Sequence, residues 1–231
     1  MLTAAAEMVQ LSATTRARFR ATIVAVAPAV LLAGFVYHPY VANATDEAAL
    51  AAAVTSDTTR WGLTHLVIGV AYGLVALAFI AVRSYVRELG EERWSALALP
   101  FAVLGSALFM ILTGMEFAPL AAAETGGDVE AAQSELIPWF APILATGGVS
   151  FALGAVGFAM AIRRSRMLSS GLTRLVVGAL VVMAVVRGVP LGASQYVIGV
   201  AGVVALWPLA AEMWKHPQPR PAGQPRSVAA S

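Results

Sequence analysis

Long apolar runs separated by short polar stretches dominate the chain from residue 21 onward. A membrane-spanning helix needs about 17 to 25 mostly apolar residues, which each run supplies or closely approaches. Backbone groups in hydrocarbon must bond within their own segment, and no two-residue alternation typical of membrane strands is visible. The pattern predicts an all-α polytopic membrane helical bundle with six transmembrane helices, at residues 21–37, 62–82, 95–115, 137–162, 169–189 and 192–211.

The fifth run is the shortest. Its uncharged stretch, 175–186, corresponds to about 18 Å of helix. It crosses a bilayer only if Arg174 and Arg187 extend toward opposite interfaces, before a tight turn at Pro190 and Gly192. The alternative is a re-entrant or interfacial segment.

Composition indicates that lipid is the solvent. The chain is 59% hydrophobic and 12% charged, whereas soluble domains carry about 25% charged residues. The absence of cysteine excludes disulfides, thiolate metal sites and a cysteine nucleophile. Abundant Ala, Val, Gly and Arg with a single Lys is typical of a GC-rich bacterial genome.

The distribution of positive charge predicts the orientation. Loops on the cytoplasmic side of membrane proteins are enriched in Lys and Arg. With a cytoplasmic N-terminus, all but two of the 15 basic residues fall on that side, the exceptions being Arg60 and Arg187. We therefore expect both termini in the cytoplasm of a cell membrane. Basic residues in short loops indicate topology, so a lipid bilayer is the expected partner and nucleic acid is not.

Three regions follow from this reading. Residues 1–20 form a cytoplasmic segment, 21–212 the transmembrane domain, and 213–231 a disordered Pro-rich tail. Two polar outer loops, 38–60 and 116–136, are too short for separate domains. Alternatively, Ala42-Asn43-Ala44 is a signal-peptide cleavage site, which would leave five helices.

Polar side chains gather near the non-cytoplasmic ends of five helices. A charged group at the centre of a membrane helix costs about 2.5–3.5 kcal/mol on insertion scales, so such residues mark candidate sites. Glu116 and Arg187 have opposite charges at a similar expected depth, and we predict that they pair; alternatively, both reach outer water. The candidate ligand or ion-pair residues are His38, Arg60, His65, Glu116, Arg187 and Gln195.

The two histidines of this group are weak candidates for a metal or haem site. His65 shares a helical face with Trp61, Gly69 and Tyr72, and the glycine would allow close approach of a helix or ligand. A pair formed with His38 suits a haem iron or another metal. Alternatively, both imidazoles bond to loops or headgroups at the interface.

Small residues line one face of two helices: Gly147, Ser150, Gly154 and Gly157 in the fourth, and Gly199 and Gly202 beside Gln195 in the sixth. Such faces allow close helix packing in lipid. We expect them to pack within the bundle, and a homo-oligomer or membrane partner contacting the same faces is the alternative.

No catalytic residues are assigned, because no phosphate-binding glycine loop, zinc-protease helix or serine nucleophile elbow occurs. The preferred hypothesis is that the protein is a non-enzymatic accessory, sensory or small-solute-handling membrane component. The two alternatives are a haem or metal redox protein using His38 and His65, and an intramembrane enzyme whose outer-leaflet site contains His65, Glu116 and Arg187.

Overall fold

The structure is a computed structural model that describes residues 2–43, 45–187, 189 and 191–217, with side chains from residue 14. Within these residues the chain forms α-helices and no extended strand. They are α1 (Leu2–Tyr37), α2 (Glu47–Ser56), α3 (Thr58–Glu88), α4 (Arg93–Met115), α5 (Phe117–Thr125), α6 (Val129–Ser165), α7 (Ser170–Val186) and α8 (Ala193–Lys215).

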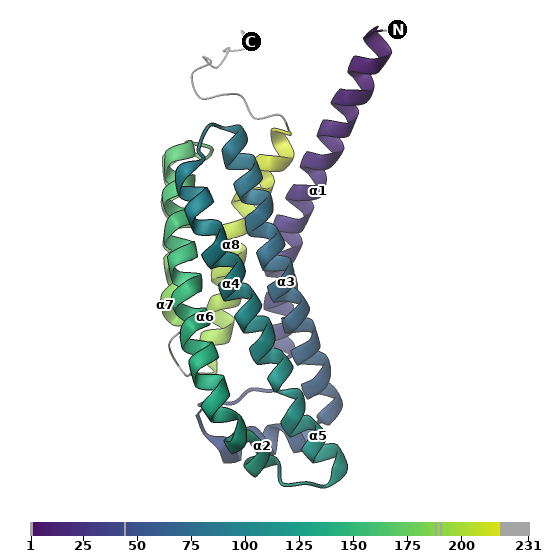
Figure 1. The fold of residues 1–231 in the computed structure, drawn as a ribbon, viewed down its shortest axis with the longest axis vertical. Helices are drawn as coiled ribbons and strands as arrows, with labels where there is room; N and C mark the ends of the chain where they lie inside the picture. The colour runs from purple at the N-terminus through teal and green to yellow at the C-terminus, as the bar shows by residue number, and fades with distance from the viewer. Residues whose placement is uncertain (1, 44, 188, 190, 218–231) are drawn as a thin grey trace.

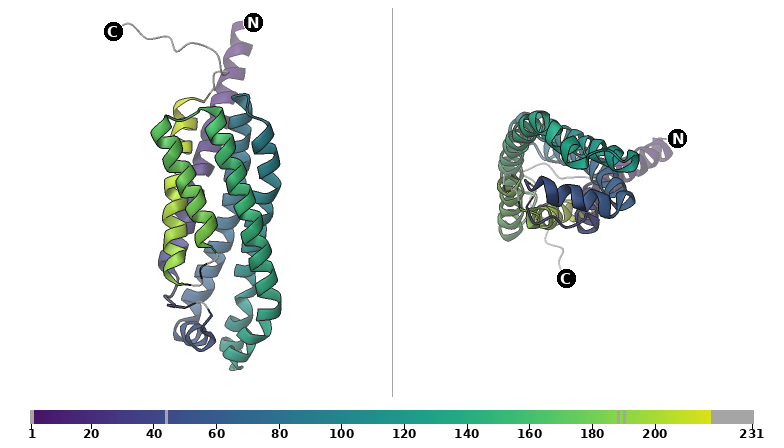
Figure 2. Two further views of the ribbon diagram at one scale, coloured as in Figure 1. Left: turned by 90° about the vertical axis from the view of Figure 1, so that its left-hand side faces the viewer. Right: turned by 90° about the horizontal axis from the view of Figure 1, so that it is seen from below.

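Six of the helices stand side by side in a ring that follows chain order (Figures 1 and 2). Each of α1, α3, α4, α6, α7 and α8 packs against the next, and α8 closes the ring against α1. The short helices α2 and α5 lie together at one end, which we call the cap end (Figure 1). We call the opposite end, where the α3–α4 and α6–α7 connections lie, the basic end.

Five helical segments are long and apolar enough to cross a membrane, which confirms an all-α membrane bundle. They are Thr14–Tyr37, Thr58–Glu88, Arg93–Thr125, Val129–Ser165 and Ala193–Lys215. The helix α7 has 17 residues and falls short of this length, although it packs between α6 and α8 as a member of the ring. A sixth span is therefore not confirmed.

A contact between two connections lies just beyond the cap-side end of α7. Asn43 and Leu191 form an isolated antiparallel bridge, and the Gly192 amide donates to the Ala42 carbonyl at 3.0 Å. A Cβ atom on Gly192 would lie 2.0 Å from the Val41 carbonyl oxygen, so only glycine permits this approach. Pro190 of the expected tight turn and Ala44 of the alternative cleavage site lie outside the described residues.

The prediction of two outer loops is wrong, because both segments are largely helical. An aspartate caps the N-terminus of each of α2, α3 and α6: Asp46, Asp57 and Asp128. Each carboxylate accepts a hydrogen bond from a backbone N–H group, at 2.8–3.0 Å. These three acidic residues of the predicted loops thus begin helices. These helices bury a small second core of Val54, Trp61, Leu120 and Val129.

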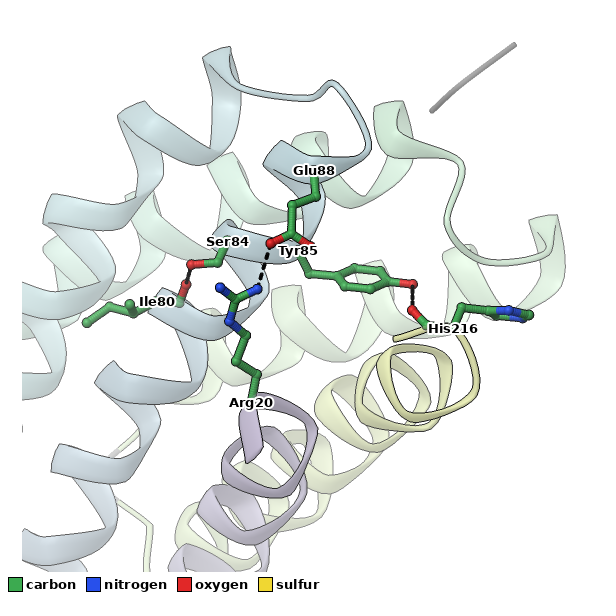
Figure 3. Close-up of polar contacts among 6 residues, drawn as sticks. All are labelled: Arg20, Ile80, Ser84, Tyr85, Glu88 and His216. Carbon is green, nitrogen blue, oxygen red and sulfur yellow. Dashed lines mark hydrogen bonds and ion pairs between the residues drawn. The ribbon is translucent and has the colours of Figure 1, made fainter. Parts of the chain in front are cut away.

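At the basic end, polar contacts join three helices (Figure 3). The Arg20 guanidinium of α1 pairs with Glu88 of α3 at 2.7 Å, and the Tyr85 hydroxyl of α3 donates to the His216 carbonyl after α8 at 3.2 Å. Helix α1 is continuous from Leu2, so the N-terminal segment prolongs the first span. The expected disordered tail lies outside the described residues from position 218.

The small-residue faces pack inside the ring. A Cβ atom on Gly154 of α6 would lie 2.6 Å from the Ala102 amide nitrogen of α4. A Cβ atom on Gly199 of α8 would lie 2.8 Å from the Leu32 side chain of α1. The packing interpretation is confirmed, and these faces are not available to the homo-oligomer or membrane partner suggested above.

We expect Gly154→Ala to destabilise the bundle by about 1–3 kcal/mol, because the added methyl group meets backbone that cannot move aside. Thermal unfolding of detergent-solubilised protein, followed by circular dichroism, measures the effect. The matched control is Gly148→Ala, since a Cβ atom there meets nothing within 4 Å. Equal melting temperatures for the two variants would contradict the proposed close contact.

Candidate functional site

The guanidinium of Arg187 lies inside the ring, about halfway along α3. Arg187 follows the last residue of α7, and the residue is only 9% exposed. Its guanidinium carbon lies 4.1 Å from the ring centre of Phe151, 4.3 Å from that of Phe109 and 5.2 Å from that of Tyr72. These rings come from α6, α4 and α3, so the arginine contacts three helices across the bundle.

The Arg187 guanidinium has one unused hydrogen-bonding edge. Its Nη1 donates to the Tyr72 hydroxyl at 3.1 Å. Nε and Nη2 are buried and have no partner. These two nitrogens form the side of the guanidinium fork that binds both oxygens of a carboxylate or phosphate. The free edge is therefore complementary to a small oxyanion.

The aromatic rings offset only part of the cost of burying this charge. A desolvated cation–π contact contributes about 2 kcal/mol, whereas desolvating an ion costs several kcal/mol and leaves each unmade hydrogen bond as a further penalty. Ionisable groups inside membranes are usually paired or functional. The contacts of Arg187 therefore offset only part of its desolvation cost.

A second polar cluster lies between the two hydrophobic cores, near the cap end. The rings of His38, Trp61 and His65 contact one another, with centroids 4.5–5.2 Å apart. His38 Nδ1 lies 2.6 Å from the Pro39 carbonyl, and His65 Nδ1 lies 2.8 Å from the Trp61 carbonyl. A carbonyl only accepts, so each Nδ1 carries a proton, and in the neutral form of each imidazole the lone pair lies on Nε2.

Glu116 lies beside this cluster, and together they form a polar layer across the bundle. The Trp61 indole N–H donates to the Glu116 backbone carbonyl at 3.2 Å, and the Gln133 side chain of α6 lies near the Glu116 carboxyl. Glu116 Oε2 and Gln133 Oε1 are buried without partners. The layer therefore offers unused acceptors, whereas Arg187 offers unused donors.

The predicted ion pair between Glu116 and Arg187 is not formed. Neither residue takes part in the ion pairs seen among the described residues, such as Arg20–Glu88 and Glu212–His216, and Arg187 Nε and Nη2 and Glu116 Oε2 have no partner. Arg187 contacts Phe109, which precedes Glu116 by two helical turns, or about 10 Å along α4. The prediction failed because α7 is short and the arginine turns inward from its end.

The other candidates divide between the polar layer and the surface. His38 and His65 meet, as the sequence suggested. Arg60 is half-buried, donates Nε to the Tyr37 carbonyl at 2.7 Å and lies over the Tyr37 ring. The half-buried Gln195 makes no side-chain hydrogen bond in the part of the chain described. His65, Glu116 and Arg187 therefore do not line one site, contrary to what the intramembrane-enzyme alternative requires.

The two histidines approach too closely to hold a haem between them. With metal–nitrogen bonds of about 2 Å, imidazoles on opposite sides of an iron have centroids about 6 Å apart. The centroids of His38 and His65 are 5.0 Å apart, and Trp61 packs against both rings. Among the residues that the structure describes, no three His, Asp or Glu side chains are grouped as metal ligands.

Two residues of the arginine site, Phe109 and Phe151, were missed by sequence reasoning. Tyr72 was recognised as part of a helical face, but Phe109 and Phe151 look like ordinary apolar residues of a span. Their role depends on helix pairing, which no local pattern encodes. No protein-family model matches the chain, and neither a curated protein nor a solved structure gives a significant match.

We predict that acidification destabilises the protein through His38, which lies just after the last residue of α1. Burial lowers the pKa of its imidazole; its hydrogen bond to Pro39 raises that pKa, and nearby Arg60 lowers it. The folded pKa lies below the unfolded value near 6.5. The resulting stability is present above that value and is lost as pH falls toward the folded pKa, because only the unfolded chain takes up the proton.

Melting temperatures between pH 7.5 and 5 measure this effect. We expect His38→Gln to flatten the acid-side fall, whereas His216→Gln, which changes an exposed histidine at the basic end, leaves it unchanged. An acid-side fall as steep in His38→Gln as in the unmodified protein would exclude this contribution.

Proposed function

We propose that this protein is a non-enzymatic, small-solute-handling membrane component that binds a small oxyanion at Arg187. The observation that carries the proposal is the buried guanidinium whose Nε and Nη2 have no acceptor. A binding function explains why the bundle retains a charge that its own side chains do not neutralise.

The surroundings of Arg187 define the class of solute. The tyrosine hydroxyl holds Nη1 and the three rings border the guanidinium, so the opposite edge is the one left for a ligand. Two parallel N–H donors match a carboxylate or a phosphate. Apolar rings beside them favour a carboxylate with an apolar substituent over a strongly hydrated anion such as phosphate.

The same proposal places the protein in the cell membrane of a bacterium, with both termini in the cytoplasm. The basic end of the bundle then faces the cytoplasm, in agreement with the charge distribution. Solute would reach Arg187 from the cap end, past the polar layer formed by His38, His65 and Glu116.

Anion binding is tested with detergent-solubilised protein and acetate, benzoate or inorganic phosphate, with chloride at equal ionic strength as the reference. A ligand present at 100 times its Kd adds about 2.7 kcal/mol of stability, which raises Tm by roughly 5–10 °C. We expect benzoate to raise Tm most. Arg187→Lys keeps the charge but lacks the fork, so its affinity should fall at least tenfold.

Arg187→Met separates binding from a purely structural role. Methionine of similar length removes the buried charge, so we expect unchanged or higher stability without anion and no anion-dependent rise in Tm. Arg60→Met, at a half-buried arginine near the cap end, is the control and should keep the rise. Anion responses equal in Arg187→Met and unmodified protein would refute the proposed function, as would strong destabilisation of Arg187→Met without any response in the unmodified protein.

The topology is tested by cysteine labelling, because the natural chain contains no cysteine. In intact bacterial cells, we expect a membrane-impermeant maleimide to label Glu124→Cys at the cap end. Glu92→Cys at the basic end should react only after the membrane is permeabilised. The reverse pattern would invert the orientation proposed here without affecting the anion site.

A further inference from the structure

An open apolar groove of about 620 Å³ runs along the outside of the bundle between α7 and α8. Its walls are formed by Leu175, Gly178 and Val182 of α7 and by Val197, Val200 and Val204 of α8. A Cβ atom on Gly178 would meet nothing within 4 Å, so the missing side chain widens the groove.

The groove has one charged end. Arg174, in the first turns of α7, lines it at the basic end, and Tyr196 lines it toward the cap end. The Arg174 side chain is exposed and makes no hydrogen bond or ion pair within the described residues. From Arg174 to Val182 the groove follows about 12 Å of helix, comparable with one leaflet of a hydrocarbon core about 30 Å thick.

We infer that this groove binds one phospholipid with an anionic headgroup, in the leaflet at the basic end. An acyl chain occupies the apolar walls and the phosphate pairs with Arg174. Charge decides between the candidate occupants. An apolar helix from a second copy or another protein would cover Arg174 and leave its guanidinium without an anion. A phospholipid fills the apolar groove with its acyl chain and also pairs its phosphate with the guanidinium.

Native mass spectrometry of protein reconstituted with equal amounts of phosphatidylglycerol and phosphatidylcholine tests the inference. Both lipids carry a phosphate, but only phosphatidylglycerol has a net negative headgroup. We expect one retained phosphatidylglycerol per chain and at least a fivefold preference for it. Arg174→Gln should abolish the preference, whereas Arg87→Gln, which removes an exposed charge from the same end on the opposite side of the ring, should preserve it.

Filling the groove tests the acyl-chain part of the inference. Gly178→Leu should reduce retention of both lipids at least fivefold, while Gly148→Leu, at a second glycine with open space, should leave retention unchanged. Circular dichroism establishes that the variants are folded. Two results would overturn the inference. One is lipid retention that depends neither on headgroup charge nor on the Gly178→Leu substitution. The other is a dimer whose cross-links form through Val182 and Val200. Neither result bears on Arg187, which faces the interior from the other end of α7.

Discussion

The contacts of the Arg187 guanidinium tie the ring together across its interior. Each helix otherwise packs mainly against its two neighbours, whereas this side chain extends from α7 to the aromatic rings of α3, α4 and α6. Cation–π attraction strengthens as water is excluded, so the interior is the setting where such contacts contribute most. The same burial leaves Nε and Nη2 without acceptors. One side chain thus links α7 to three other helices and keeps two buried nitrogens without acceptors.

The bundle is organised in layers along its axis. A main core fills most of the ring, a small core fills the cap, and the layer containing His38, His65 and Glu116 separates them. The buried imidazoles are tolerated there because backbone carbonyls accept hydrogen bonds from their Nδ1 atoms. Glu116 Oε2 and Gln133 Oε1 remain without hydrogen-bond partners in this layer.

Helix α7 joins the two proposed binding features. Its short length brings Arg187 to the middle of the bundle instead of an interface, while Arg174 stays exposed at the basic end. An arginine buried against aromatic rings avoids lipid, and an exposed one attracts phosphate, because a guanidinium always remains charged. The opposite environments of these two residues follow from which face of the helix the ring covers.

The sequence alone determined the helical class, the apolar segments and the separation of charge between the two ends, because lipid as a solvent requires long apolar helices. It also indicated the close packing at Gly154 and Gly199, since small residues repeat at helical spacing. Only the tertiary structure decided the partners of Arg187. Phe109 and Phe151 are ordinary span residues until α4 and α6 are placed side by side, and that pairing depends on contacts distant in the chain. Helix formation in the two segments predicted as polar loops, the length of α7 and the absence of the Glu116–Arg187 pair depend on those same long-range contacts.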